Sequence, residues 1–251
     1  MPRRADAALG ALLALAVATG AGCGAPLAPR QTAMVGRNPV RFATPAGWEH
    51  LDHGREQLFR RGEAQVSLAD HGPVSREAVA RELRAAERLW LDGRRADAFR
   101  RVLDLRTPVS QFSSEAQAKD FWRPWLAATS RPGDPDSLAV GAAFATLVAG
   151  ADSLARPSAE QLRQYAFSLA CDPRRSEVER FASRVLHGAE WTDVHAWDRT
   201  SHLNRSRFAF TVNDGYLLVL KFDHGVFERV EPAFEALLGS LEVGPRPAAV
   251  R

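Results

Sequence analysis

The hydrophobic positions of this chain change their spacing along its length, which separates strand-forming from helix-forming segments. Residues 38–73 alternate apolar and polar side chains, so that Val66 and Leu68 share one face of an extended run. The loop Gly62-Glu63 separates this run from the one before it, as in a β-hairpin. This first block is therefore expected to form strands.

Residues 75–190 instead show the spacing of helices. Ser75 is suited to be an N-cap and Gly93 to end the same helix, and between them apolar residues recur at steps of four, three and four: Val79, Leu83, Ala86 and Trp90. Further helices are expected at residues 94–105, 115–128, 137–155, 159–170 and 176–187. The apolar run 138–151 is too short to span a membrane and is expected to be a buried core helix.

Residues 191–244 return to strands and end in a helix. Asn213-Asp214-Gly215 lies between two apolar runs and is a strong hairpin signal. The run after it, 216–222, is apolar on both faces, which is typical of a central strand covered on both sides. A helix over 226–238 and a short strand over 241–243 are expected to close the domain.

Strands at both ends with helices between them predict an α+β fold, an antiparallel sheet packed by helices. We expect one domain over residues 38–244, with 38–73 and 191–244 forming the sheet and 75–190 forming a large central helical segment. Residues 245–251 remain as a C-terminal tail.

Residues 1–22 have the pattern of an export signal. Arg3 and Arg4 precede an apolar run over 7–18, and small residues then lead to Cys23. The apolar run is shorter than the roughly 20 residues that a membrane-spanning helix needs. The mature protein is therefore expected in the cell envelope.

Cys23, following Ala21-Gly22, resembles the lipid-attachment cysteine of bacterial lipoproteins, although Gly20 occupies the position of the usual aliphatic residue. The alternative is an ordinary secretory signal that is cut near Ala18 or Gly20. With lipid on Cys23, residues 23–37 form a tether to the membrane. Gly24 then implies the outer membrane, facing the periplasm, if the cell has two membranes.

Composition supports a folded domain and argues against nucleic-acid binding. Apolar residues make up 45% of the chain and charged residues 25%, close to the values of globular proteins. The formal net charge is only +3, and the basic residues, nearly all arginines, are interspersed with acids. A nucleic-acid surface needs a clustered basic field, and the sequence shows none.

Two terminal segments together resemble the PsbP-like α/β/α sandwich family and related exported bacterial lipoproteins. Residues 40–48 read VRFATPAGW, which is similar to the first strand and "Pro-x-Gly-Trp" turn of that family. Residues 215–222 read GYLLVLKF, and after a helix residues 238–241 read LGSL, similar to its closing elements. The central block contains more helix than that fold usually has. The resemblance implies binding to or assembly with other proteins, and it supplies no catalytic residues.

Three Asp-His-Gly triplets are the first candidates for chemistry, with His53, His71 and His224 at their centres. Histidines on converging loops could hold a metal ion or transfer protons. The alternative is that the triplets are turns, because Asp and Gly favour turns and His tolerates left-handed backbone.

Other candidate groups give little sign of catalysis. Cys171 follows an apolar helix and is expected to be a buried, inert thiol, unpaired if Cys23 carries lipid. The chain has no Gly-x-Ser-x-Gly elbow and no glycine-rich phosphate loop, so no catalytic residue and no cofactor is expected.

Three aromatic residues lie close together in the helical segment: Phe121, Trp122 and Trp125. Exposed on the surface, they would form a binding patch; buried, they would form the centre of the helical core. Both interpretations are open at the level of sequence.

These observations favour an exported, lipid-anchored envelope protein that acts as a non-catalytic binding or assembly module. Its expected partner is an envelope protein or an apolar ligand. The alternative hypothesis is an exported metal-dependent hydrolase that uses the Asp-His-Gly loops.

Overall fold

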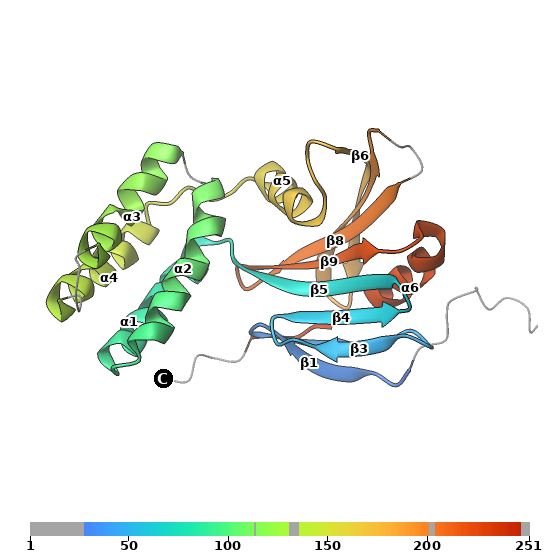
Figure 1. Cartoon of the computed structure of the whole chain (residues 1–251), viewed down its shortest axis with the longest axis horizontal. Coiled ribbons are helices and arrows are strands. Elements are labelled where there is room, and N and C mark those ends of the chain that lie inside the picture. The colour runs from blue at the N-terminus through green and yellow to red at the C-terminus, as the bar shows by residue number, and fades with distance from the viewer. Residues whose placement is uncertain (1–27, 113, 131–135, 201–203, 247–251) are drawn as a thin grey trace, which may run out of the picture.

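The computed structural model describes residues 28–112, 114–130, 136–200 and 204–246. Figure 1 shows a curved sheet with helices on its faces and a separate bundle of helices beside one end of the strands. The predicted α+β class, an antiparallel sheet packed by helices with a large central helical segment, is confirmed.

Seven strands form the main sheet, in which all neighbouring strands are antiparallel. In spatial order they are β3 (Glu49–Asp52), β4 (Glu56–Arg61), β5 (Ala64–Pro73), β9 (Tyr216–His224), β8 (Arg205–Asn213), β7 (Ala189–Asp198) and β6 (Ser176–Leu186). A smaller sheet contains β1 (Gln31–Val35), β2 (Asn38–Phe42) and β10 (Glu242–Val243). Strand β9 is the middle strand of the seven, as its two apolar faces predicted.

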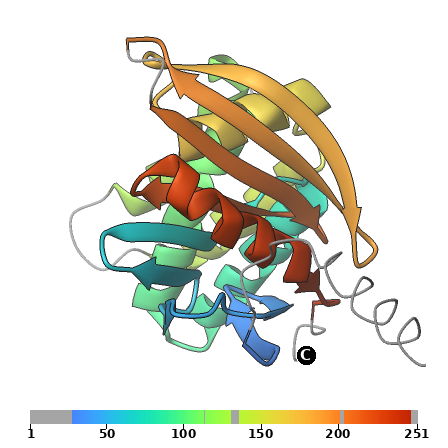
Figure 2. The same ribbon diagram turned by 90° about the vertical axis from the view of Figure 1, so that its right-hand side faces the viewer.

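Each face of β9 packs against a different helix. Leu218 and Leu220 belong to the core under α6 (Phe227–Ser240), whereas Leu217 and Val219 belong to the core that includes Tyr165 of α5 (Ala159–Ala170). Figure 2 shows α6 lying across one side of the sheet and α5 behind it. The sheet is thus the middle layer of a helix–sheet–helix sandwich.

The remaining four helices form a bundle with a hydrophobic core of its own. They are α1 (Arg76–Leu91), α2 (Arg95–Phe112), α3 (Glu115–Thr129) and α4 (Ser137–Ala151). The Ser75 side chain accepts from the backbone amide of Ala78 and caps α1 as predicted, and Gly93 follows its end with a φ of 77°. This bundle is inserted between β5 and α5, and Figure 1 shows that it projects away from the sheet.

The Asn213-Asp214-Gly215 hairpin between β8 and β9 also touches the bundle. Asp214 and Gly215 have φ values of 50° and 82°, as a two-residue hairpin turn requires. A Cβ atom added at Gly215 would lie 2.2 Å from Oγ of Ser75, so only glycine fits where the hairpin meets the start of α1. The pairing of β9 with β5 therefore places the hairpin against the inserted helices.

The prediction of a helix over residues 176–187 is wrong, because this segment is strand β6. Val178, Phe181 and Val185 recur every three or four residues, which imitates one face of a helix. Ten residue pairs with β7 and positive φ values at His187 and Gly188 instead make it one arm of a hairpin. The helical segment accordingly ends with α5, and the sheet-forming region begins before residue 191.

Two further expectations need correction. Gln31–Val35, part of the predicted tether over 23–37, forms strand β1. Helix α4 is not buried on all sides: Phe144 and Leu147 are fully buried, but Leu138 is 82% exposed.

Residues 1–22 and Cys23 lie outside the described residues, so the export signal and the lipid site stay predictions. Within the described part of the chain, no helix is both long enough and apolar enough to cross a membrane.

Candidate functional site

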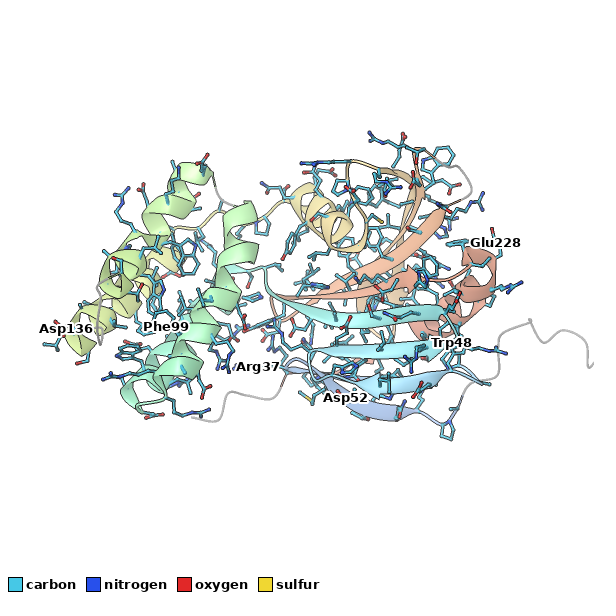
Figure 3. All side chains as sticks on the ribbon, in the orientation of Figure 1. Arg37, Trp48, Asp52, Phe99, Asp136 and Glu228 are labelled. Atoms are coloured by element: carbon cyan, nitrogen blue, oxygen red, sulfur yellow. The ribbon has the colours of Figure 1, made fainter. Side chains whose placement is uncertain are left out.

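A charged cleft of about 430 Å³ separates the inserted bundle from the nearest end of the sheet. Its walls come from the β1–β2 turn, the β3–β4 turn, β5, β9, helices α1 and α2, and the C-terminal tail. Figure 3 shows Arg37 reaching into this region between helices and strands. Its polar lining residues are Arg37, Arg55, Asp70, Glu82, Arg94, Asp97, Arg100, Arg101, Asp104, Tyr216 and Arg246.

Glu82 is the centre of this cleft, and it joins three other parts of the fold to α1. Its carboxylate accepts from the Tyr216 hydroxyl at 2.5 Å and from Nε of Arg101 at 2.6 Å. Nη1 of Arg37 lies 3.3 Å from the same carboxylate. Since Glu82 is only 7% exposed, these partners are what make its burial tolerable. Glu82 thereby connects the bundle to β9 and to the β1–β2 turn.

Tyr216 is buried and lies against two guanidinium groups. The Cζ atom of Arg246 is 3.2 Å from the centre of the Tyr216 ring, and that of Arg81 is 5.8 Å from it. Burial, followed by the charge of Glu82 and the hydrogen bond to it, raises the pKa of the Tyr216 hydroxyl. This hydroxyl is therefore a hydrogen-bond donor in the cleft and is poorly suited to act as a base.

Asp70 is the second buried acid of the cleft and is held by backbone and side-chain donors. Its carboxylate accepts from the Gly72 amide at 2.8 Å and from Nδ2 of Asn38 at 3.2 Å. Desolvation by burial is the largest influence and raises the pKa of Asp70 in spite of these bonds. Gly36 approaches it closely, because a Cβ atom there would lie 2.2 Å from Oδ2 of Asp70.

Two larger hollows differ from this cleft in chemistry. One of about 570 Å³ lies over β7 and β8, and one of about 780 Å³ lies beside Trp48 at the far end of the sheet. Neither is lined by a buried acid, nor by a described residue whose buried polar atom lacks a hydrogen-bond partner. Because the charged cleft has both, it is the candidate functional site.

The aromatic cluster lies inside the helical bundle and not on its surface. Phe121, Trp122 and Trp125 are 8%, 4% and 2% exposed. The Trp125 ring packs between Phe99 at 5.2 Å and Phe144 at 5.0 Å, measured between ring centres. The interpretation of this cluster as a possible binding patch is therefore replaced by that of a packed core, and Phe99 is visible among the helices in Figure 3.

The three Asp-His-Gly triplets do not converge. His53 lies in the β3–β4 turn, at the end of the sheet where β4 starts. His224 lies at the end of β9, near the opposite end of the sheet. The glycines that follow the three histidines all have positive φ values, 75°, 90° and 122°, so the triplets are turns and a strand irregularity. Among the described residues no group of three or more His, Cys, Asp or Glu side chains could hold a metal ion. The geometry therefore gives the metal-dependent hydrolase hypothesis no site.

Cys171 and His71, two further candidates for chemistry, both lie outside the charged cleft. Cys171 ends α5 against the core, and burial raises the pKa of its thiol, which disfavours the reactive thiolate. Desolvation lowers the pKa of His71 to about 4, so its imidazole is neutral at physiological pH. Neither residue lines the charged cleft.

The residues of the cleft were missed at the level of sequence. Glu82 and Arg101 are ordinary charged positions in helix patterns, and Tyr216 is one member of an apolar strand. One feature of the sequence could have indicated the site. Glu82 lies beside Val79 and Leu83 on the apolar side of α1, where a buried carboxylate requires a hydrogen-bond partner.

Comparisons with known proteins give a likeness in structure and none in sequence. No protein-family model matches the chain, and no curated protein matches its sequence. The fold is similar to the solution structure of cyanobacterial PsbP (CyanoP) from Synechocystis sp. PCC 6803, with 11% sequence identity and a TM-score of 0.42. The match covers 92% of this chain and 99% of that one.

Proposed function

We propose that this chain is an exported, lipid-anchored envelope protein whose folded part is a non-catalytic binding module. The charged cleft is its ligand site, and it opens on the side of the domain that faces away from the membrane. The observation that carries this proposal is the position of the cleft relative to Ala28, the first described residue after Cys23.

Ala28, the first residue that the structure describes, lies near the end of β1 that is far from the cleft. The Ala28 amide donates to the Thr44 carbonyl at 2.9 Å, which fixes the entry of the chain beside the β2–β3 connection. Gly36 and Arg37, which line the cleft, follow the other end of β1. Five strand residues at about 3.3 Å each place roughly 17 Å between these two points. Trp48 and Glu228 mark the entry side in Figure 3, and Arg37 marks the cleft side.

The tether proposed for this protein is short. Ala28 comes five positions after Cys23, and a fully extended chain covers at most about 3.6 Å per position, or roughly 18 Å in all. A lipid on Cys23 would therefore keep the entry side of the domain near the bilayer surface. The cleft, at the other end of β1, would be directed toward the periplasmic space.

Binding fits the chemistry of the cleft better than catalysis does. Its buried acids, Glu82 and Asp70, are both occupied as hydrogen-bond acceptors. Its hydroxyl, on Tyr216, is held as a donor and has a raised pKa. The cleft volume is within the range of small-molecule sites, about 300–1,000 Å³.

Mass spectrometry of the mature N-terminus tests the anchor. We expect a chain that begins at a lipid-modified Cys23, and accumulation of the uncut precursor when the lipoprotein signal peptidase is inhibited. The Cys23→Ala variant is expected to leave the membrane fraction, whereas the matched Cys171→Ala variant is expected to stay in it. An intact cytosolic chain beginning at Met1 would overturn the proposal.

Fluorescence quenching by spin-labelled lipids tests the orientation. In a Cys171→Ala background, a fluorophore attached at position 228 is expected to be quenched in native membranes. A fluorophore at position 37 is expected to be quenched much less, because it lies on the cleft side. Equal quenching at both positions would contradict the proposed orientation.

A further inference from the structure

Two arginines of the charged cleft carry buried guanidinium nitrogens that nothing in the described part of the chain pairs. These atoms are Nη2 of Arg101 and Nη1 of Arg246. A charged donor that is shielded from water and lacks a partner costs more free energy than a neutral one. Both residues line the same cavity, so a single ligand could satisfy both.

A chain of contacts through Glu82 and Tyr216 connects these two arginines. Arg101 donates through Nε to Glu82 at 2.6 Å, and Glu82 accepts from the Tyr216 hydroxyl at 2.5 Å. Arg246 lies on the Tyr216 ring, with 3.2 Å between its Cζ atom and the ring centre. The two guanidinium groups therefore flank the Tyr216–Glu82 pair from different parts of the chain.

The cleft as a whole has more positive than negative charge. Six arginines and four acidic residues line it, an excess of two positive charges. Four of the arginines share two acids: Arg37 and Arg101 pair with Glu82, and Arg94 and Arg100 pair with Asp97. Desolvation by burial lowers the pKa of Arg246, because the nearby negative charges do not fully offset the cost of burying its guanidinium group.

Apolar side chains also line the cavity. They are Leu89 of α1, Leu105 of α2 and Pro73 at the end of β5, of which Leu89 is partly exposed and the other two are buried. A free inorganic ion would leave the exposed part of Leu89 in contact with water, whereas a small organic molecule would cover it. The cavity volume of about 430 Å³ suits a ligand of that size.

We propose that the cleft binds a small organic anion, whose carboxylate or phosphate group takes the unpaired nitrogens of Arg101 and Arg246. The short hydrocarbon part of the ligand lies against Leu89. This inference rests on the proposed binding function and names the ligand class. Charge-assisted hydrogen bonds from two guanidinium groups are among the strongest available to such a site.

Isothermal titration calorimetry of the mature full-length chain, at pH 7 and low salt, tests whether the cleft binds such an anion. The probes are citrate, glycerol 3-phosphate and inorganic phosphate, and glycerol is the neutral control. We expect a dissociation constant below 1 mM for citrate or for glycerol 3-phosphate. The two organic probes distinguish a carboxylate from a phosphate ligand. We expect weaker binding of inorganic phosphate and none of glycerol.

Arg246→Gln is the cleanest variant, because Arg246 has no ion pair with any described residue. We expect it to weaken binding at least tenfold, and Arg101→Gln to do the same provided that its melting temperature is unchanged. Arg84→Gln, which removes the same charge from an exposed position of α1, is the matched control and is expected to bind as the parent does.

The possible results separate the two proposals. No heat of binding with any anion, or equal weakening by Arg246→Gln and Arg84→Gln, would overturn the assignment of an anion site. A lipid-modified Cys23 together with such a result would leave the envelope role intact and remove only the ligand class. Binding of inorganic phosphate as tightly as the organic probes would overturn the role of the apolar wall.

Discussion

Replacement of Glu82 by alanine is expected to loosen the joint between the inserted bundle and the sheet. The carboxylate is 7% exposed and bonds to Tyr216 at 2.5 Å and Arg101 at 2.6 Å, with Arg37 at 3.3 Å. Breaking one side of a buried pair typically costs 3–5 kcal/mol, because the other side is left unsatisfied. Arg37 is 47% exposed and Arg101 20% exposed, so water partly compensates them. We therefore expect a loss of about 3 kcal/mol in the free energy of unfolding.

Urea unfolding at pH 7, followed by tryptophan fluorescence, measures this loss. Glu82→Gln keeps the shape and an acceptor for Tyr216 but removes the charge, so about half of the loss, roughly 1.5 kcal/mol, is expected. Glu87→Ala on the same helix is the matched control and is expected to change stability by less than about 0.5 kcal/mol. A Glu82→Ala variant that loses less than about 1 kcal/mol, or no more than the Glu87→Ala control, would refute the reasoning.

Three other predictions concern the core and the pH dependence of stability. Trp125→Ala is expected to lower the free energy of unfolding in urea by about 3–5 kcal/mol, because the ring is 2% exposed between two aromatic neighbours. A change below about 0.5 kcal/mol would contradict a buried ring and favour the surface binding patch. Desolvation lowers the pKa of His71 from 6.5 to about 4, so as pH falls the unfolded chain binds a proton before the folded chain does. The contribution of the neutral imidazole to the free energy of unfolding is therefore fully present above about pH 6.5 and decreases by roughly 3 kcal/mol by pH 4. His71→Gln is expected to flatten that part of the pH profile, and an unchanged profile would contradict the assignment. The hydrogen bond from Arg184 lowers the pKa of Glu235 to about 2, so its contribution is present above pH 4.5 and is lost as pH falls through 2. Since the Glu235 side chain is 44% exposed, solvent screening reduces this contribution to about 1 kcal/mol. The urea midpoint measured as a function of acid pH is expected to show this loss in the parent chain and not in Glu235→Gln.

Local signals in the sequence were sufficient for the elements that local chemistry controls. The Asn213-Asp214-Gly215 hairpin and the cap at Ser75 form as predicted, because each depends on backbone preferences within a few residues. The two-faced pattern of residues 216–222 likewise predicted the central strand. Strand β6 was missed because its apolar residues imitate a helix and its structure depends on pairing with β7.

The candidate site could not be predicted, because it is a product of topology. Glu82 and Tyr216 are 134 residues apart, and only the pairing of β5 with β9 brings the start of α1 to the β8–β9 hairpin. Arg246 reaches the same place from the tail, a segment that carries no sequence signal of its own. The role of a charged helix residue such as Glu82 can be assigned only once the fold shows which side chains face it.

Hydrogen exchange measured by mass spectrometry, with and without saturating citrate or glycerol 3-phosphate, tests the central claim most directly. The account predicts slower exchange around residues 36–37, along 100–105 and around Tyr216, with no change around residues 45–48 and 224–229. Protection confined to the far end of the sheet, or no protection anywhere, would contradict a ligand site between the inserted helices and the strands.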